Sequence, residues 1–87
     1  MVKKEIVINN PMGLHLKAAG VLCNTAINYK SSIQFKHGGT TSNAKSVLSV
    51  LGACVKEGDT LEFICEGPDE AEALDAVIGV LSQGING

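Results

Sequence analysis

His15 and Lys17 are the residues of this chain whose types and spacing best suit a chemical task. They lie in segment 10–19, which is rich in turn-forming residues and leads into a helical pattern. At the first turn of a helix, unpaired backbone N–H groups and the positive end of the helix dipole would face any group that His15 carries. Lys17 would add a positive charge close by. A neutral imidazole in this setting suits a reversible phosphoryl acceptor.

A simpler interpretation makes His15 an ordinary surface residue. Asn10 could cap the helix, with Pro11 at its first position. Gly13 would then lie inside the helix, where glycine costs about 1 kcal/mol relative to alanine, whereas a glycine before the helix suits a turn. Because short motifs often match by chance, the residue types alone favour the simpler interpretation.

Composition narrows the class of protein. The 87 residues are predicted to form a single domain, 1–87. Apolar residues make up 45% of the chain, enough for a core, and charged residues only 18%, which argues against disorder. The net charge is −2, every cationic side chain is a lysine, and the aromatic residues are one tyrosine and two phenylalanines. We therefore expect no nucleic-acid partner.

The apolar runs and the cysteines predict where the protein works. No apolar run is long enough to cross a bilayer, and the one that follows Lys3 and Lys4 is too short for a signal peptide. We therefore expect a cytoplasmic protein that does not contact the membrane. Cys23, Cys54 and Cys65 are widely spaced and form no CxxC pair, so we predict reduced thiols buried as small hydrophobic residues, with no metal and no cofactor.

Apolar periodicity predicts the element order β-α-β-β-α-β-α. The strands alternate apolar and polar residues, and the two longer helices carry apolar residues at i, i+3, i+4 and i+7. Strands are expected at 2–8, 32–37, 40–43 and 60–66, and helices at 16–29, 47–53 and 69–84, the last ending at Gly84. The simplest way to bury these faces is an α+β sandwich of two layers, with one antiparallel sheet and all helices on one side.

Glycines predict a hairpin in the middle of the chain. Gly38 and Gly39 both accept positive φ, so the flanking strands should turn there. The second of them, 40–43, is short and polar, as an edge strand should be. We expect His37, beside this turn, to be a solvated loop residue with no role.

Two helix starts carry capping signals. Ser46 is a candidate N-cap for the short second helix. Asp69, with Glu72 three residues later, resembles a capping box for the last helix.

The short second helix has more apolar residues than one narrow stripe needs, at positions 47, 48, 50 and 51. Some of them should stay exposed, which suggests a docking surface. Burial of all of them in the core explains the pattern equally well.

The chain resembles the histidine-containing phosphocarrier protein HPr of the bacterial sugar phosphotransferase system. The resemblance covers almost the whole chain, in order. It rests on Gly13-Leu14-His15 before a helix of small residues, on Lys45-Ser46-Val47-Leu48, and on Gly67-Pro68-Asp69-Glu70.

The resemblance implies a fold and a carrier function. The fold is an open-faced two-layer sandwich, with a four-stranded antiparallel sheet and three helices on one face. Nδ1 of His15 would accept a phosphoryl group from enzyme I, itself charged by phosphoenolpyruvate, and pass it to an enzyme IIA. The protein is then a stoichiometric carrier, not an enzyme. Ser46 would be a regulatory site in bacteria that have an HPr kinase.

The resemblance also implies a partner-facing surface, and we expect the carrier to be a monomer. Lys17 would stabilise the phosphate. The residues expected to face partners are Leu16, Lys17, Gly20, Val21, Val47, Leu48 and Leu51.

Two positions depart from the family pattern. HPr proteins usually have arginine and then proline where this chain has Lys17 and Ala18. Lysine keeps the charge but lacks the planar fork that grips phosphate, and alanine lacks proline's fixed φ. Two hypotheses stay open: a working phosphocarrier in sugar uptake, or an HPr-like regulatory binding module controlled by phosphorylation at Ser46 or His15.

Overall fold

The computed structural model describes residues 1–82 and has the seven elements in the predicted order. The predicted end of the last helix, at Gly84, lies outside the described residues. The elements are β1 (Val2–Val7), α1 (Leu16–Ala26), β2 (Ser32–His37), β3 (Thr40–Asn43), α2 (Val47–Gly52), β4 (Thr60–Glu66) and α3 (Glu70–Ser82).

The first helix ends three residues earlier than predicted. After Ala26, the N–H groups of Asn28 and Tyr29 bond to the carbonyls of Thr25 and Ala26, each at 3.2 Å. These bonds span three residues instead of four, so the chain tightens into a turn and leaves the α-helical path.

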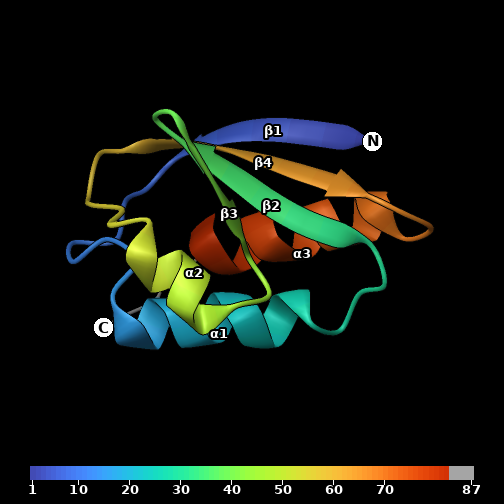
Figure 1. Cartoon of the computed structure of the whole chain (residues 1–87), viewed down its shortest axis with the longest axis horizontal. Coiled ribbons are helices and arrows are strands. Elements are labelled where there is room, and N and C mark those ends of the chain that lie inside the picture. Colours follow the sequence, from blue (N-terminus) through green and yellow to red (C-terminus); the bar gives the residue numbers. More distant parts are fainter. Residues whose placement is uncertain (83–87) are drawn as a thin grey trace.

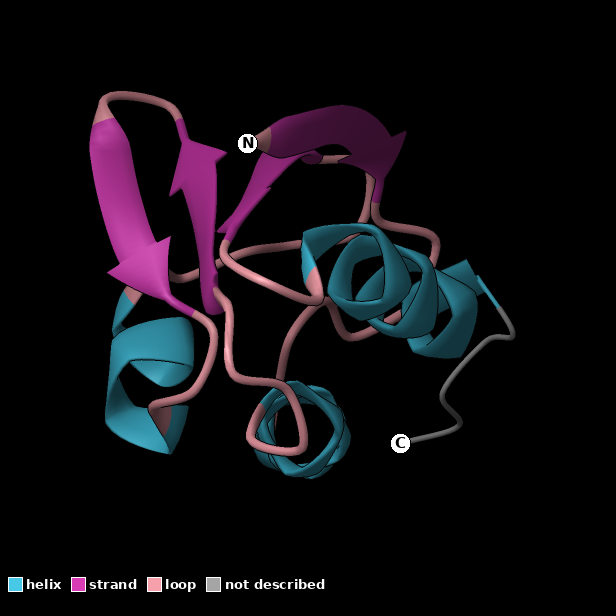
Figure 2. Ribbon diagram, turned by 90° about the vertical axis from the view of Figure 1, so that its right-hand side faces the viewer, coloured by secondary structure: helices cyan, strands magenta, loops and turns pink. Residues whose placement is uncertain are grey.

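The four strands form one antiparallel sheet in the order β1-β4-β2-β3. β2 and β3 pair across the Gly38-Gly39 turn, and β3 lies at one edge, so the predicted hairpin and edge strand are confirmed. All three helices lie on the same side of the sheet, which leaves its other face open (Figures 1 and 2). The predicted open-faced two-layer α+β sandwich is therefore confirmed.

The core fills the space between the sheet and the helices. Phe35 of β2 and Phe63 of β4 are opposite each other in the sheet, with ring centroids 5.3 Å apart, and both are fully buried. The predicted stripe of α1 is confirmed: its buried residues are Ala18, Ala19, Leu22, Cys23 and Ala26. Because most of them are small, α1 can lie close to the rest of the core.

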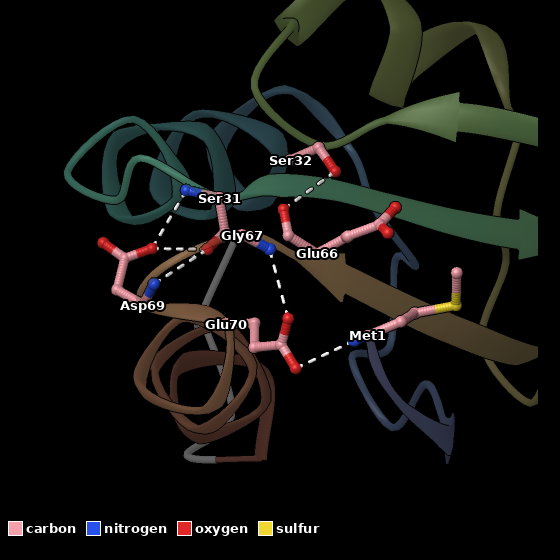
Figure 3. A network of polar contacts seen from close by, with 7 residues as sticks. All are labelled: Met1, Ser31, Ser32, Glu66, Gly67, Asp69 and Glu70. Carbon is pink, nitrogen blue, oxygen red and sulfur yellow. Dashed lines mark hydrogen bonds and ion pairs between the residues drawn. The ribbon is translucent and has the colours of Figure 1, made fainter.

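The Asp69 carboxylate joins the start of α3 to the α1–β2 connection (Figure 3). Its oxygens accept hydrogen bonds from the N–H groups of Lys30 and Ser31, at 3.0 and 2.9 Å, and from the Ser31 hydroxyl. The predicted capping box with Glu72 is therefore wrong, because both oxygens are turned to another segment. Glu70 instead accepts from the Gly67 N–H at 3.1 Å and pairs with the N-terminal ammonium at 2.9 Å.

Asp69→Ala is expected to destabilise the fold near neutral pH and to matter less in acid. The Ser31 hydroxyl and the backbone N–H groups lower the pKa of Asp69 from 3.8 to about 2. A lowered pKa means that the ionised carboxylate stabilises the folded state above the ordinary value, and that this contribution is lost as the pH falls through about 2.

Thermal unfolding followed by circular dichroism at a series of pH values checks this prediction. Near neutral pH we expect the melting temperature of Asp69→Ala to fall by about 5 °C. Glu72→Ala, in the same first turn of α3, is the matched control and should change little. An equal loss in both variants would favour the capping box over the contacts described here.

Candidate functional site

His15 is the N-cap of α1, which begins at Leu16. Its backbone is extended, and its Nδ1 accepts a hydrogen bond from the Lys17 N–H at 3.2 Å. An accepting nitrogen carries a lone pair, so Nδ1 is the unprotonated, nucleophilic atom of the ring and faces the free N–H groups of the helix start. The alternative in which Asn10 caps the helix is excluded by this helix boundary.

A tight turn before the helix fixes the position of His15. Gly13 has φ +64°, and its N–H donates to the Asn10 carbonyl at 2.9 Å. A Cβ on Gly13 would overlap the Val55 carbonyl oxygen and lie 2.7 Å from the Lys56 Cα. The buried Leu14 donates its N–H to the same Val55 carbonyl at 3.1 Å. The glycine is therefore required by the turn, as the sequence indicated, and also by this close approach, which the sequence did not indicate.

The short helix α2 lies beside α1 and leaves apolar surface exposed (Figure 1). Ser46 is its N-cap and accepts a hydrogen bond from the Ser49 N–H at 3.2 Å, as predicted. Val50 is fully buried, whereas the Leu48 side chain is 82% exposed. The core therefore does not take every apolar residue of this helix, and the predicted exposed apolar group is confirmed at Leu48.

The other residues predicted to face partners lie on the same two helices. Leu16 is 69% exposed, directly after His15, and Lys17 is exposed as well. Gly20 and Val21 in α1, and Val47 and Leu51 in α2, are half-buried.

The prediction that all three cysteines are buried is wrong at Cys54. Cys23 and Cys65 are buried, and burial raises the pKa of both thiols. Cys54 is exposed and has φ 55°, because the chain turns sharply after α2 before it reaches β4. Within residues 1–82, no group of three or more His, Cys, Asp or Glu side chains is placed to hold a metal ion.

His37 is not a solvated loop residue, contrary to the prediction. It is the last residue of β2, its side chain is 24% exposed, and both ring nitrogens have partners. A sequence signal was available: positions 33, 35 and 37 alternate on one strand, so His37 shares the inward face of Ile33 and Phe35.

The family model for the PTS HPr component phosphorylation site matches residues 2–83. The chain belongs to the HPr family. The HPr phosphocarrier protein of Mycoplasma pneumoniae is 31% identical over 95% of this chain and 96% of its own length. The HPr-like protein Crh of Halalkalibacterium halodurans is 30% identical over 95% and 99% of the two chains.

Solved HPr structures have the same fold. HPr from Thermoanaerobacter tengcongensis has a TM-score of 0.93 at 30% identity, covering 95% of this chain and 93% of that one. A dimer of the same HPr has a TM-score of 0.76, with 95% of each chain covered. Among the described residues, no helix is long and apolar enough to span a membrane.

Proposed function

We propose that this HPr protein is a cytoplasmic phosphocarrier of sugar uptake, with His15 as the phosphoryl acceptor. The observation that carries the proposal is the Nδ1 lone pair of His15, held at the start of α1 by the Lys17 N–H. As the bond between phosphorus and its donor on enzyme I breaks, a P–N bond to Nδ1 forms. Transfer to an enzyme IIA repeats this step with His15 as the donor. No proton has to leave Nδ1 before the attack, but the Lys17 N–H has to release the Nδ1 lone pair as the P–N bond forms.

The helix start supplies the electrostatic part of the transfer. The phosphoryl group is anionic, and the unpaired N–H groups of the first turn, together with the positive end of the helix, stabilise negative charge. Lys17 adds a full positive charge near this end. Because a lysine offers a point charge instead of a planar fork, we expect slower transfer than with the arginine usual at this position.

The proposed docking surface consists of the exposed and half-buried residues of two helices. They lie on the helices that His15 and Ser46 cap, and Leu48 is the most exposed of them. The members are Leu16, Gly20, Val21, Val47, Leu48 and Leu51.

Leu48→Ala is expected to weaken binding to enzyme I and to an enzyme IIA by about tenfold or more, because a central apolar anchor carries a large share of the binding energy. The melting temperature should hardly change, since the Leu48 side chain makes little contact with its own fold. Ile27→Ala, at the far end of α1 and 59% exposed, is the matched control. Isothermal titration calorimetry measures both affinities, and an equal effect in the two variants would rule out this surface.

Intact mass spectrometry tests the proposal as a whole. The protein is mixed with phosphoenolpyruvate and its cognate enzyme I, and the site is then mapped by fragmentation. One added, acid-labile phosphoryl group on His15 is the expected result. An unmodified protein, with active enzyme I and a folded sample, would disprove the carrier role.

A regulatory role is the second candidate, and the position of Ser46 favours it. The Ser46 hydroxyl caps α2 two residues before the exposed Leu48, so a phosphate there would add about −1.5 to −2 charges next to the docking surface. The protein would then act as an HPr-like binding module, with an HPr kinase as its partner. Incubation with ATP and an HPr kinase should add one acid-stable phosphoryl group if this role exists.

We also propose that the carrier is a monomer, because the docking surface has to be free to meet successive partners. Sedimentation equilibrium tests this directly. A dimer mass would overturn the monomer and would match the dimers solved for relatives of this chain.

A further inference from the structure

The His37 side chain, at the end of β2, contacts two residues that lie 16 and 22 positions later in the sequence. Its Nδ1 is 2.9 Å from the carbonyl oxygen of Ala53, the C-cap of α2. Its Nε2 is 2.8 Å from Oδ2 of Asp59, which immediately precedes β4. The same Oδ2 accepts a hydrogen bond from the Lys56 N–H at 2.9 Å. The imidazole therefore holds both ends of segment 53–59 against the end of β2.

Both ring nitrogens of His37 face oxygen acceptors. The Ala53 carbonyl can only accept, so Nδ1 must carry a proton. Asp59 is ionised near neutral pH, because the Lys56 N–H, followed by His37, lowers the pKa of its carboxyl group. An ionised carboxylate also only accepts, so the contact at Nε2 is satisfied when that nitrogen carries a proton too. The imidazole can therefore donate a hydrogen bond to each of the two segments, and Asp59, with Lys56 beside it, is the acid that it faces.

Segment 53–59, whose two ends His37 contacts, packs against the turn before His15. The Val55 carbonyl accepts the Leu14 N–H, and the Val55–Lys56 backbone packs against Gly13 so closely that no Cβ fits. At the other end of the segment, Ile8 exchanges hydrogen bonds with Gly58 and Asp59, at 2.8 and 2.9 Å. The position of His15 therefore depends on where segment 53–59 lies.

We propose that His37, with Asp59 as its partner, is a positioning residue that holds the turn before His15 in place for phosphoryl transfer. The inference rests on the carrier role proposed above. His37 does not touch the phosphoryl group in this proposal. It acts through segment 53–59, whose displacement would move the Nδ1 of His15 out of line with the incoming phosphorus. Small misplacements of this kind are costly, since a shift of about 1 Å can cost roughly 100-fold in rate.

The test compares phosphoryl transfer from phosphorylated enzyme I to the wild type and to His37→Ala. We expect the transfer rate at saturating concentration to fall by about tenfold, with a smaller change in KM, because no docking residue is replaced. Amide hydrogen exchange should quicken at Leu14, whose N–H bonds to Val55, and stay slow at Ala19, whose N–H bonds to the His15 carbonyl within the helix.

Asp69→Ala is the matched control, because it removes a hydrogen-bond cluster at the opposite end of the same strand, beside Ser31. It should lower the melting temperature without slowing transfer. His37→Gln can still donate to Asp59 and should recover part of the rate. If His37→Ala does not fold, the single variants His37→Gln and Asp59→Asn take its place, and both are expected to transfer the phosphoryl group more slowly than the wild type.

The outcomes separate this inference from the carrier role. A wild type that takes no phosphoryl group overturns both. A wild type that is phosphorylated, with His37→Ala equally fast, overturns the positioning role alone. Equal slowing by Asp69→Ala also overturns it, because the effect would then follow general stability.

Discussion

His15→Asn is expected to abolish phosphoryl uptake and to leave the fold almost unchanged. The amide cannot form the P–N bond that an imidazole nitrogen forms, so intact mass after incubation with phosphoenolpyruvate and enzyme I should show no added group. The side-chain oxygen of asparagine can still accept the Lys17 N–H that Nδ1 accepts in the wild type. Asparagine is among the best N-cap residues, so the start of α1 keeps its cap.

His15→Ala is the comparison that separates chemistry from structure. It should also take up no phosphoryl group, but it loses the cap, which typically costs about 1 kcal/mol. Urea unfolding should therefore place His15→Asn near the wild type and His15→Ala below it. Phosphorylation of His15→Asn at the wild-type level would show that another residue is the acceptor.

The fold could be predicted because the spacing of apolar residues within each strand and helix shows which of its faces is buried. Ile33 and Phe35 alternate with polar residues along β2, and both are buried. The same alternation holds at Leu61, Phe63 and Cys65 in β4. A periodic pattern fixes which face of an element meets the core, but it does not fix the order of the strands in the sheet, which depends on pairings between distant segments.

The candidate site could be predicted where the signal is a short local motif. Gly13 argued for a turn before the helix, but the residue types alone favoured the simpler interpretation of His15, and the resemblance to HPr was needed to favour the helix start. Ser46 followed from its residue type before an apolar run. The exposure of Leu48 followed from too many apolar residues for one face of α2. What these residues do in phosphoryl transfer remains a proposal.

The contacts that could not be predicted are side-chain bonds between distant segments. Asp69 has the residue type of a local cap, but its carboxylate meets Ser31, which comes 38 positions earlier. His37 and Asp59 are 22 positions apart. Pairings of this kind depend on the sheet register and on the course of the loops, and neither one is visible in a single sequence.

The close approach of two backbone segments at Gly13 leads to the largest expected effect on stability. Gly13→Ala should lower the free energy of unfolding by about 4 kcal/mol, measured by urea denaturation. Part of this cost is the strain of a side chain at φ +64°. The larger part is the overlap of the new Cβ with the Val55 carbonyl and with the Lys56 Cα at 2.7 Å, because backbone atoms cannot move aside as a flexible side chain can.

Gly38→Ala separates these two costs. Gly38 has nearly the same φ, +61°, but a Cβ there would meet nothing within 4 Å. It should therefore lose only the backbone strain, about 1 kcal/mol. A domain of this size is stabilised by roughly 5–15 kcal/mol. Gly13→Ala would therefore remove a large part of the free energy of unfolding, whereas Gly38→Ala would remove a small part. If the two variants were equally stable, the turn before His15 would not rest on segment 53–59, and the route by which His37 positions the phosphoryl acceptor would be lost with it.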